Sequence, residues 1–407
     1  MIRMSPSPVA PLDFPMLLRF SLLLALAVLA ANSVSAAPYL PASDAQVLEH
    51  LPFKPNDPVA RELAQMRATL QRNPRDVVVA VRLGWRYFDL VAAEGDPRYL
   101  GYAQAALAPW WALPTPPLDV QVLRASLRQF RHDFPGALAD LNQALEREPR
   151  HPRARSLRAT IHIVQARYAD AQRDCLALRS VASELVALGC EAMVQGLTGH
   201  AAQAYAALNR MLAQQTAATP EERLWVDTRL AEMAQRLGRN DAAEAHFKQA
   251  LALGITDTFL LAAYADFLLD HGRAQEVVKL LQDKTRSDTL LLRLVFAEHA
   301  LKLPSATARA TTLADRFSAA QMRGDTVHQQ EEARFALHIQ HDPKRALVLA
   351  QANWQVQREP RDARIFLEAA LAAKDPVAAQ PVLRWLSESG IEDAYLIGLA
   401  QQLKALS

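Results

Sequence analysis

The chain has 407 residues, a formal net charge of +2 and 51% hydrophobic residues. This apolar fraction with so little net charge excludes an intrinsically disordered protein, and near-neutrality excludes the broad positive surface that nucleic-acid binding needs. Two cysteines exclude a small domain framed by several disulfides and a zinc site made of four cysteines. Only 13 glycines, together with abundant alanine and leucine, favour helices.

A signal for export is predicted near the N-terminus. The run from Phe20 to Ala31 is apolar, follows Arg19 and is followed by small residues at 34–37. Such a pattern is typical of a secretory signal peptide, so we expect residues 1–36 to be removed before Ala37. The run is shorter than the roughly 20 residues that a membrane-spanning helix needs. The alternative is an uncleaved segment that anchors the chain in the inner membrane.

Short patterns recur along the rest of the chain at a fixed interval. The residues at 123–125 (Leu-Arg-Ala) recur 34 residues later at 157–159, and the pair Ala231 and Gly238 recurs 34 residues later. Small residues suit positions where two helices approach closely. Gly238 and its counterpart Gly272 suit the end of a first helix, where the backbone turns left-handed. The interval therefore predicts repeated helix–turn–helix units.

The chain resembles the tetratricopeptide repeat (TPR) family, here of an exported bacterial type. The clearest unit is Leu224–Asp257, whose matching residues are Leu230, Ala231, Gly238, Ala243, Phe247 and Ala250. Three further units match: Leu118–His151, Pro152–Leu185 and Thr258–Leu291. Degenerate units are expected near 77–110, 186–219, 292–328, 329–362 and 363–396. The resemblance covers about residues 59–400 and implies an all-α, right-handed α-solenoid of roughly nine stacked helix pairs.

The sequence divides into five segments. We expect a signal peptide (1–36), an extended proline-rich arm (37–58), degenerate N-terminal repeats with a linker (59–117), the clearest repeats (118–291) and degenerate C-terminal repeats (292–407). Two linkers interrupt the helices. Pro109–Pro117 is expected to be non-helical because it contains four prolines besides a Trp pair, and Gln214–Glu221 is polar.

The TPR resemblance also implies where a partner binds. In that family the side chains of the first helices face a concave groove that binds peptides or partner proteins. At the matching positions this chain has polar residues of mixed charge, which suit a polar peptide: Gln129, Arg153, Thr160, Glu232, Gln235, Asp266 and Asp270. The alternative is that these residues form a solvated surface without a ligand.

The two cysteines and two histidines leave alternatives open. Cys175 and Cys190 are expected on adjacent antiparallel helices at similar height, so they form either a disulfide or two buried thiols. His338 and His341 are three residues apart, near His328, and form either part of a metal site or a solvated surface before a turn.

Two further groups of side chains each allow two interpretations. Trp110 and Trp111 either close the end of the helical core or form an exposed anchor for a partner. A run of arginines forms either a solvated surface at helix ends or a patch for an anionic ligand: Arg147, Arg150, Arg153, Arg155 and Arg158.

No common catalytic, nucleotide-binding or metal-binding motif occurs in the sequence, so we expect no enzyme activity and no cofactor. The leading hypothesis is a periplasmic scaffold of a Gram-negative bacterium that binds a protein or peptide. One alternative is a component of an envelope assembly or export machine that works with a membrane-bound partner. Another is a metal-handling or enzymatic protein that uses the region His328–His341.

Overall fold

The computed structural model describes residue 43 and residues 56–406. The predicted signal peptide (1–36) and all but a few residues of the predicted arm (37–58) lie outside the described residues. The chain divides into two units, 1–60 and 61–407, and the helical repeats lie in the second unit. The described residues form helices and contain no strand, so the predicted all-α repeat fold is confirmed. None of these helices is both long enough and apolar enough to span a bilayer.

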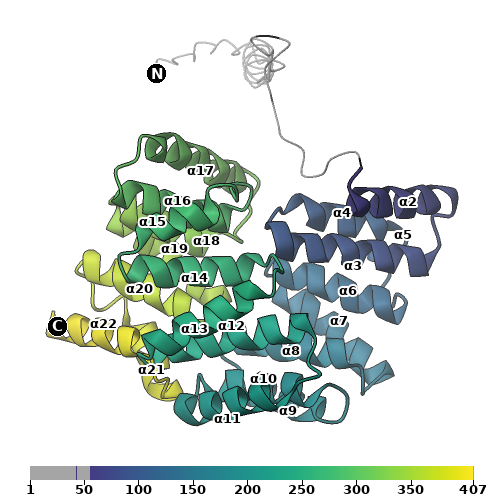
Figure 1. Ribbon diagram of the computed structural model, residues 1–407, viewed down its shortest axis with the longest axis horizontal. Helices are drawn as coiled ribbons and strands as arrows, with labels where there is room; N and C mark the ends of the chain where they lie inside the picture. The colour runs from purple at the N-terminus through teal and green to yellow at the C-terminus, as the bar shows by residue number, and fades with distance from the viewer. Residues whose placement is uncertain (1–42, 44–55, 407) are drawn as a thin grey trace, which may run out of the picture. The chain divides into compact units, whose positions relative to one another are not determined.

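Nine antiparallel helix pairs follow one another within residues 56–406 (Figure 1). The helix α2 (Pro58–Arg72) precedes them, α5 (Ala108–Trp111) lies in a linker, and α22 (Ala394–Ala405) follows them. The pairs are α3 (Val77–Glu94) with α4 (Arg98–Ala106), α6 (Leu118–Phe130) with α7 (Phe134–Arg147), α8 (Pro152–Val164) with α9 (Tyr168–Leu178), α10 (Glu184–Gln195) with α11 (Ala201–Gln214), α12 (Pro220–Arg236) with α13 (Asn240–Ala252), α14 (Thr258–Asp270) with α15 (Ala274–Leu281), α16 (Asp288–Ala300) with α17 (Ser305–Met322), α18 (Gln329–His338) with α19 (Pro343–Val356), and α20 (Pro360–Ala372) with α21 (Gln380–Ser389).

Packing between pairs follows the pattern of small and large residues. In the clearest unit Ala231 and Ala243 are completely buried, which lets α12 and α13 approach closely. Phe247 is also completely buried and lies 5.3 Å from Tyr264 and 5.6 Å from Phe267, measured between ring centres. Its ring therefore fills the space between one pair and the next. The first helix of each pair contacts the first helix of the next, from α3 through α20 to α22.

Every turn within these nine pairs contains one residue with positive φ. The predicted glycine turns are confirmed at Gly238 and Gly272, both with φ of 70°. Two other pairs also use glycine, at Gly95 and Gly199. The remaining five turns place a side chain in this left-handed conformation, with φ between 54° and 59°: His132, Ala166, Lys302, His341 and Lys374. The left-handed residue is thus common to all nine turns, whereas it is a glycine in fewer than half of them.

The linker at 109–117 differs from the prediction. The short helix α5 begins at Ala108 and includes Trp110 and Trp111, so the prediction that residues 109–111 are non-helical was wrong. The physical reason is that Pro109 stands in the first turn, where a helix tolerates its missing N–H. Trp110 and Trp111 are both half-buried. They are therefore neither fully buried at the end of the helical core nor fully exposed as an anchor for a partner.

Some unit boundaries also differ from the prediction. The helices α12 and α16 each begin four residues before the predicted units at 224 and 292. The side chains of Thr219 and Ser287 cap these earlier starts by accepting hydrogen bonds from the first turn.

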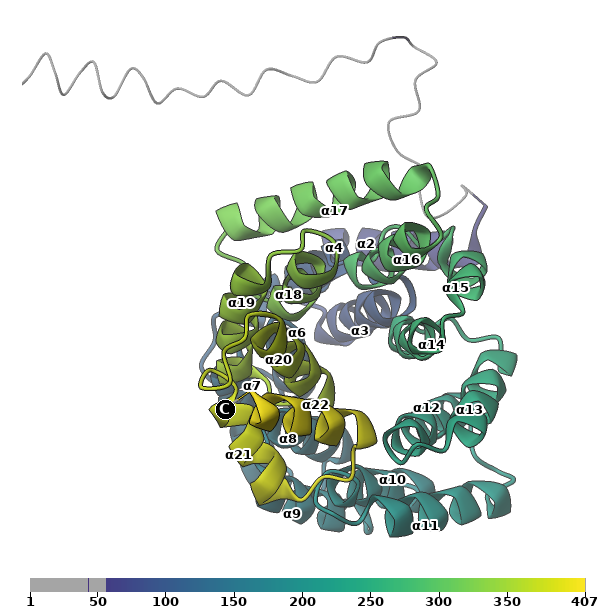
Figure 2. The same cartoon turned by 90° about the vertical axis from the view of Figure 1, so that its left-hand side faces the viewer.

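Units far apart in the sequence contact one another within the array. One apolar cluster contains residues of α8–α10 together with residues of α18–α22. Trp385 of α21 donates a hydrogen bond to the Tyr168 hydroxyl in α9 at 3.0 Å, and the Arg358 N–H donates to the Val164 carbonyl at 2.7 Å. Figure 2 shows α21 and α22 beside α8 and α9. The third and fourth pairs therefore pack against the last pair and α22.

A disulfide joins Cys175 of α9 to Cys190 of α10, with the two Cα atoms 5.3 Å apart. Both residues are buried, and both belong to the apolar cluster shared by α8–α10 and α18–α22. Of the two alternatives for these cysteines, the structure contains the disulfide. It links the third helix pair to the fourth.

The left-handed turns make Lys302 a site where glycine is expected to stabilise the protein. The residue is exposed and has φ of 54°, a conformation that costs a residue with a Cβ roughly 1–2 kcal/mol. We expect Lys302→Gly to raise the free energy of unfolding by about 1 kcal/mol in urea titrations. Lys302→Ala removes the same side chain but keeps the Cβ, so it serves as the control and should bring no gain. An equal effect of both variants would contradict the assignment of strain to this turn.

Candidate functional site

An ionic network lies on the side of the array where first helices meet. It connects α14 to α16, α18 and α20, and it is here called the inner cluster. Its residues are Asp266, Asp270, Arg293, Arg334, Arg364 and Glu368.

Asp266 of α14 holds two arginines at once. Its carboxylate lies 2.7 Å from Arg293 Nη2 in α16 and 2.8 Å from Arg334 Nη2 in α18. The side chain of Arg293 is only 4% exposed. Burial alone would raise the pKa of Asp266, but the charges and hydrogen bonds of the two arginines hold it well below its usual range. The carboxylate is therefore ionised and joins three successive first helices.

Asp270 extends the network to α20. Arg364 donates hydrogen bonds to both oxygens of Asp270, at 2.7 and 2.8 Å, although 94 residues separate the two. Arg364 Nε also donates to Glu368 Oε1 at 2.8 Å. Burial alone would raise the pKa of Glu368, but the hydrogen bond from His338 and the charge of Arg364 lower it to about 2.

An aromatic ring of α14 makes further contacts with arginines outside the inner cluster. The ring of Phe259 in α14 lies 4.2 Å from the guanidinium carbon of Arg229 in α12 and 5.5 Å from that of Arg361 in α20. A cation beside a ring face is attracted by the ring quadrupole. Phe259 thus connects α12 and α20 through two cation–π contacts.

The predicted groove residues fall into two groups. Glu232 forms an ion pair with Arg229 at 2.7 Å, and Gln235 Nε2 lies 3.4 Å from Asp270 Oδ2. These two residues, with Asp266 and Asp270, lie together on α12 and α14. Asp266 and Asp270 already bind arginines of the chain itself, so neither carboxylate is free for a ligand.

The other three predicted groove residues lie elsewhere. Gln129 is in α6, whereas Arg153 and Thr160 are in α8. The Arg153 guanidinium lies 4.0 Å from the ring centre of Trp85, and the Thr160 hydroxyl donates to the Ser156 carbonyl. Within residues 56–406, no hydrogen bond or ion pair joins these three to the inner cluster.

The arginines of the inner cluster were not predicted from the sequence. Arg293, Arg334 and Arg364 lie on the first helices of units that lack clear repeat motifs. One signal was present, because the first helix at 258–270 has two acidic residues and no lysine or arginine, whereas the first helices of the later pairs each contain arginine.

A pocket opens between the first helices α18, α20 and the terminal helix α22. Its volume is about 610 Å³, within the range typical of ligand pockets. Leu337, Leu371 and Leu399 provide apolar walls, whereas His338, Glu368, Tyr395 and Gln402 provide polar groups. The Tyr395 hydroxyl donates to Glu368 Oε1 at 2.8 Å, so the pocket adjoins the inner cluster.

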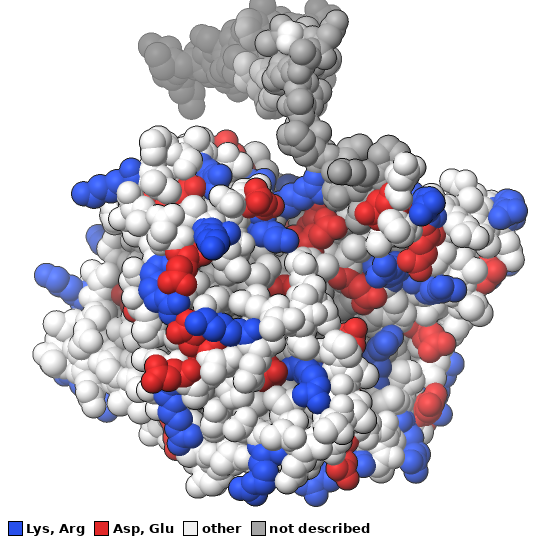
Figure 3. All heavy atoms as spheres, in the orientation of Figure 1, with Lys and Arg blue, Asp and Glu red and all other residues white. Residues whose placement is uncertain are grey.

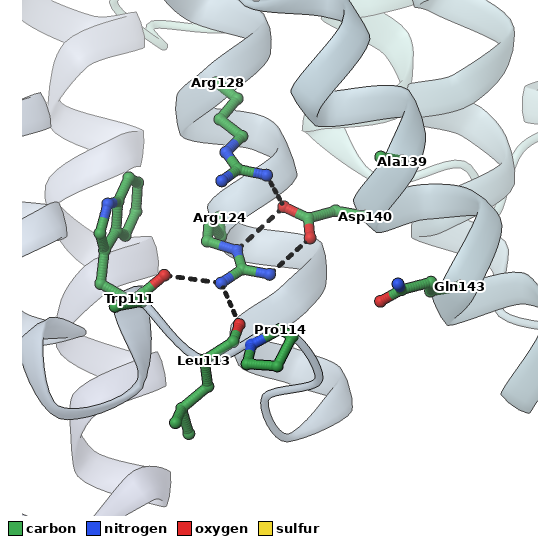
Figure 4. Close-up of a pocket in the computed structure, with 9 residues that line it drawn as sticks. Trp111, Leu113, Pro114, Arg124, Arg128, Ala139, Asp140 and Gln143 are labelled. Atoms are coloured by element: carbon green, nitrogen blue, oxygen red, sulfur yellow. Dashed lines mark hydrogen bonds and ion pairs between the residues drawn. The ribbon is translucent and has the colours of Figure 1, made fainter.

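A second pocket of about 420 Å³ adjoins the linker after α5, and Figure 4 shows its arginines. Arg124 donates to the Trp111 and Leu113 carbonyls at 2.6 and 2.8 Å, and two further bonds reach the Asp140 carboxylate. Arg128 donates to Asp140 as well. These hydrogen bonds fix the linker against α6 and α7, which gives the arginines a structural role.

The proposed metal site at the C-terminal histidines has little support from the geometry. His338 is the last residue of α18, whereas His341 lies in the following turn with φ of 54°. The two therefore do not share a helix face. No group of three or more His, Cys, Asp or Glu residues in the described part of the chain is arranged to hold a metal ion.

The run of arginines near residue 150 is also largely paired. Arg155 and Arg158 both bind Asp174, at 3.0 and 2.7 Å. Arg147 donates to the Pro116 carbonyl at 2.9 Å. Because these arginines have partners within the chain, a solvated, paired surface describes the run better than a patch for an anion. Over the face shown in Figure 3, positive and negative side chains are likewise interspersed.

No protein-family model matches the chain, and no curated protein matches it. Among solved structures, it is similar to a tetratricopeptide repeat protein from Parabacteroides merdae, with 16% identity and a TM-score of 0.42 over 58% of this chain and 92% of that one. Yeast Tom70 is 15% identical with a TM-score of 0.35, over 80% of this chain and 62% of Tom70. Human IFIT1, in a dimer with m7Gppp-AAAA, is 13% identical with a TM-score of 0.36, over 85% of each chain. At TM-scores this low the likeness carries no argument about ligands, and the chain's own helix pairs establish the repeat fold.

Removing the carboxylate of Asp266 is expected to be strongly destabilising. Asp266→Ala leaves Arg293 buried without its acidic partner, which typically costs 3–5 kcal/mol when a buried pair is broken, so we expect a loss of about 3 kcal/mol. Urea unfolding measures the change. Asp315→Ala, at an exposed position in the middle of α17, is the control and should change stability by less than about 0.5 kcal/mol. Equal stabilities for both variants would refute the role of Asp266.

Asp362 gives the protein a predictable pH dependence. Burial and the nearby Glu359 carboxylate raise its pKa from 3.8 to about 7. Between these values the folded state binds more protons than the unfolded state, so this residue's contribution to stability falls as the pH rises from about 4 to about 7.

Asp362→Asn removes that titration. A pKa difference of one unit corresponds to about 1.4 kcal/mol. As the pH rises from about 4 to about 7, the unchanged chain should therefore lose a few kcal/mol of stability relative to Asp362→Asn. Urea midpoints measured at intervals from pH 4 to pH 8 test this. A difference that stays constant with pH would show that Asp362 has an ordinary pKa.

Proposed function

We propose that this chain is an exported, non-catalytic scaffold that binds a protein or peptide segment in the pocket between α18, α20 and α22. The observation that carries the proposal is the pocket itself, which first helices of consecutive pairs and the terminal helix form. Leucine walls suit an apolar side chain of a partner, and the polar groups at its edge suit the partner's backbone.

Two observations support export to the periplasm of a Gram-negative bacterium. The first is the apolar run from Phe20 to Ala31 with its flanking basic and small residues. The second is the disulfide between Cys175 and Cys190, because disulfides persist in oxidising compartments and are rare in the cytosol.

A non-catalytic role agrees with the chemistry of the pocket. Glu368 is ionised, with its pKa lowered to about 2, and it accepts hydrogen bonds from Arg364 and Tyr395. Burial and the Glu368 charge raise the pKa of Tyr395 to about 12. Neither group is suited to donate and accept protons near neutral pH, which acid–base catalysis requires.

Filling the pocket tests the proposal. Gly398 of α22 lines the pocket, and a Cβ added there meets no atom within 4 Å. Gly398→Trp is therefore expected to fill the pocket while leaving the helix intact. We expect a tagged chain to capture one dominant partner after crosslinking in the envelope fraction, and Gly398→Trp to weaken binding of that partner at least tenfold, about 1.4 kcal/mol.

The matched control is Gly101→Trp in α4, where an added Cβ also meets no atom within 4 Å. This variant should capture the partner as well as the unchanged chain does. The intact mass of the captured chain reports whether residues 1–36 have been removed. Failure to capture a partner, or an equal loss with both variants, would contradict the proposed function.

A further inference from the structure

One arginine on α12 has an unpaired guanidinium. Arg236 is the last residue of α12 and is half-buried, and its Nε is buried without a hydrogen bond. Among the described residues, it is the one arginine that is not exposed and yet has neither a hydrogen bond nor an ion pair. A guanidinium stays protonated at any pH a protein survives, so an unpaired, half-buried positive charge is unfavourable for folding.

The nearby carboxylates are already occupied. Glu232 and Asp393 are the acidic residues whose charges act on Arg236. Glu232 pairs with Arg229 at 2.7 Å, and Asp393 caps α22 by accepting hydrogen bonds from the N–H groups of Tyr395 and Leu396 at 3.1 and 3.0 Å. Burial is the largest influence on Arg236 and lowers its pKa.

Three parts of the chain meet around this guanidinium. A Cβ added to Gly196, at the end of α10, would lie 3.4 Å from Arg236 Nη2, so the glycine leaves room for the side chain. The turn after α10 approaches the turn before α22, where the Ala201 N–H donates to the Glu392 carboxylate. Figure 2 shows the ends of α10, α12 and α22 at this junction.

The junction lies at the pocket's end of α22. Asp393 directly precedes Ala394 and Tyr395, and both of these residues line the pocket between α18, α20 and α22. Arg236 is therefore near the start of α22, whose first two residues line the pocket. The arginines of the inner cluster are less suited to a ligand, because Arg293, Arg334 and Arg364 already bind Asp266 or Asp270.

We propose that Arg236 binds a carboxylate of the partner, so that the partner segment is acidic. This inference rests on the proposed function and adds the chemistry of the partner to it. The planar guanidinium offers paired N–H groups that match the two oxygens of a carboxylate. Because Glu232 and Asp393 are occupied, the missing anion comes from outside the chain.

Binding of a model acidic peptide tests the inference. The probe is a fluorescent peptide of six glutamates with blocked ends, and a peptide of six glutamines is its neutral counterpart. Fluorescence anisotropy with the purified full chain at low ionic strength should show binding of the glutamate peptide and none of the glutamine peptide. Arg236→Met should weaken that binding at least tenfold.

Arg239→Met is the matched control, because Arg239 is exposed, lies three residues later and has no ion pair among the described residues. It should change the affinity less than twofold. Arg236→Met should also raise the melting temperature of the free chain, since it removes the unpaired charge. Equal losses in both variants, or a lowered melting temperature with unchanged binding, would overturn the proposal.

Two further measurements separate the competing explanations. Inorganic phosphate that binds as tightly as the glutamate peptide would assign Arg236 to a small anion and overturn the acidic-peptide proposal. In the envelope capture experiment, a partner that Arg236→Met retains in full would overturn this inference alone. Capture of no partner by the unchanged chain would instead contradict the proposed function.

Discussion

The carboxylate of Asp266 is the interaction on which the inner face depends. It pairs with a buried arginine from α16 and another from α18, so one acidic side chain sets the spacing of three consecutive first helices. Asp270, one helical turn further along α14, does the same for α20 through Arg364. Buried ion pairs contribute little net stability, but each charge becomes costly once its partner is removed. The relative positions of these first helices therefore depend on ion pairs that join helices distant in the sequence.

These ion pairs occupy some inner surfaces of the array and leave others open. The inner faces of α14 and α16 are largely occupied by the chain's own ion pairs, whereas the pocket bordered by α18, α20 and α22 remains open. Arg236 has no ion pair because the nearby carboxylates of Glu232 and Asp393 already bind other groups. The open pocket and the inner cluster thus lie side by side, and the ion pairs hold α18 and α20, which line the pocket.

Local features of the fold were predictable from the sequence, and distant pairings were not. The helix pairs follow from an interval of 34 residues, buried alanines such as Ala231 and glycine at turns such as Gly238. The turn at Ala166 could not be predicted because its left-handed geometry is imposed by packing of the helices rather than by glycine. Asp266 was predicted as a residue of a binding groove. Its pairing with Arg334 could not be predicted, because the two residues are 68 positions apart and only the curvature of the whole array brings them together.

The apolar cluster shared by α8–α10 and α18–α22 affects how the array unfolds and whether it can gain or lose a unit. In an open solenoid each unit contacts only its neighbours, so stability spreads from unit to unit and an end can unravel alone. Here the last units share an apolar cluster and hydrogen bonds with the third and fourth, so these distant units are expected to unfold together. Insertion or loss of a single unit in evolution would move these distant surfaces out of register. The number of units is therefore constrained here, whereas an open repeat array can gain or lose a unit without separating distant surfaces.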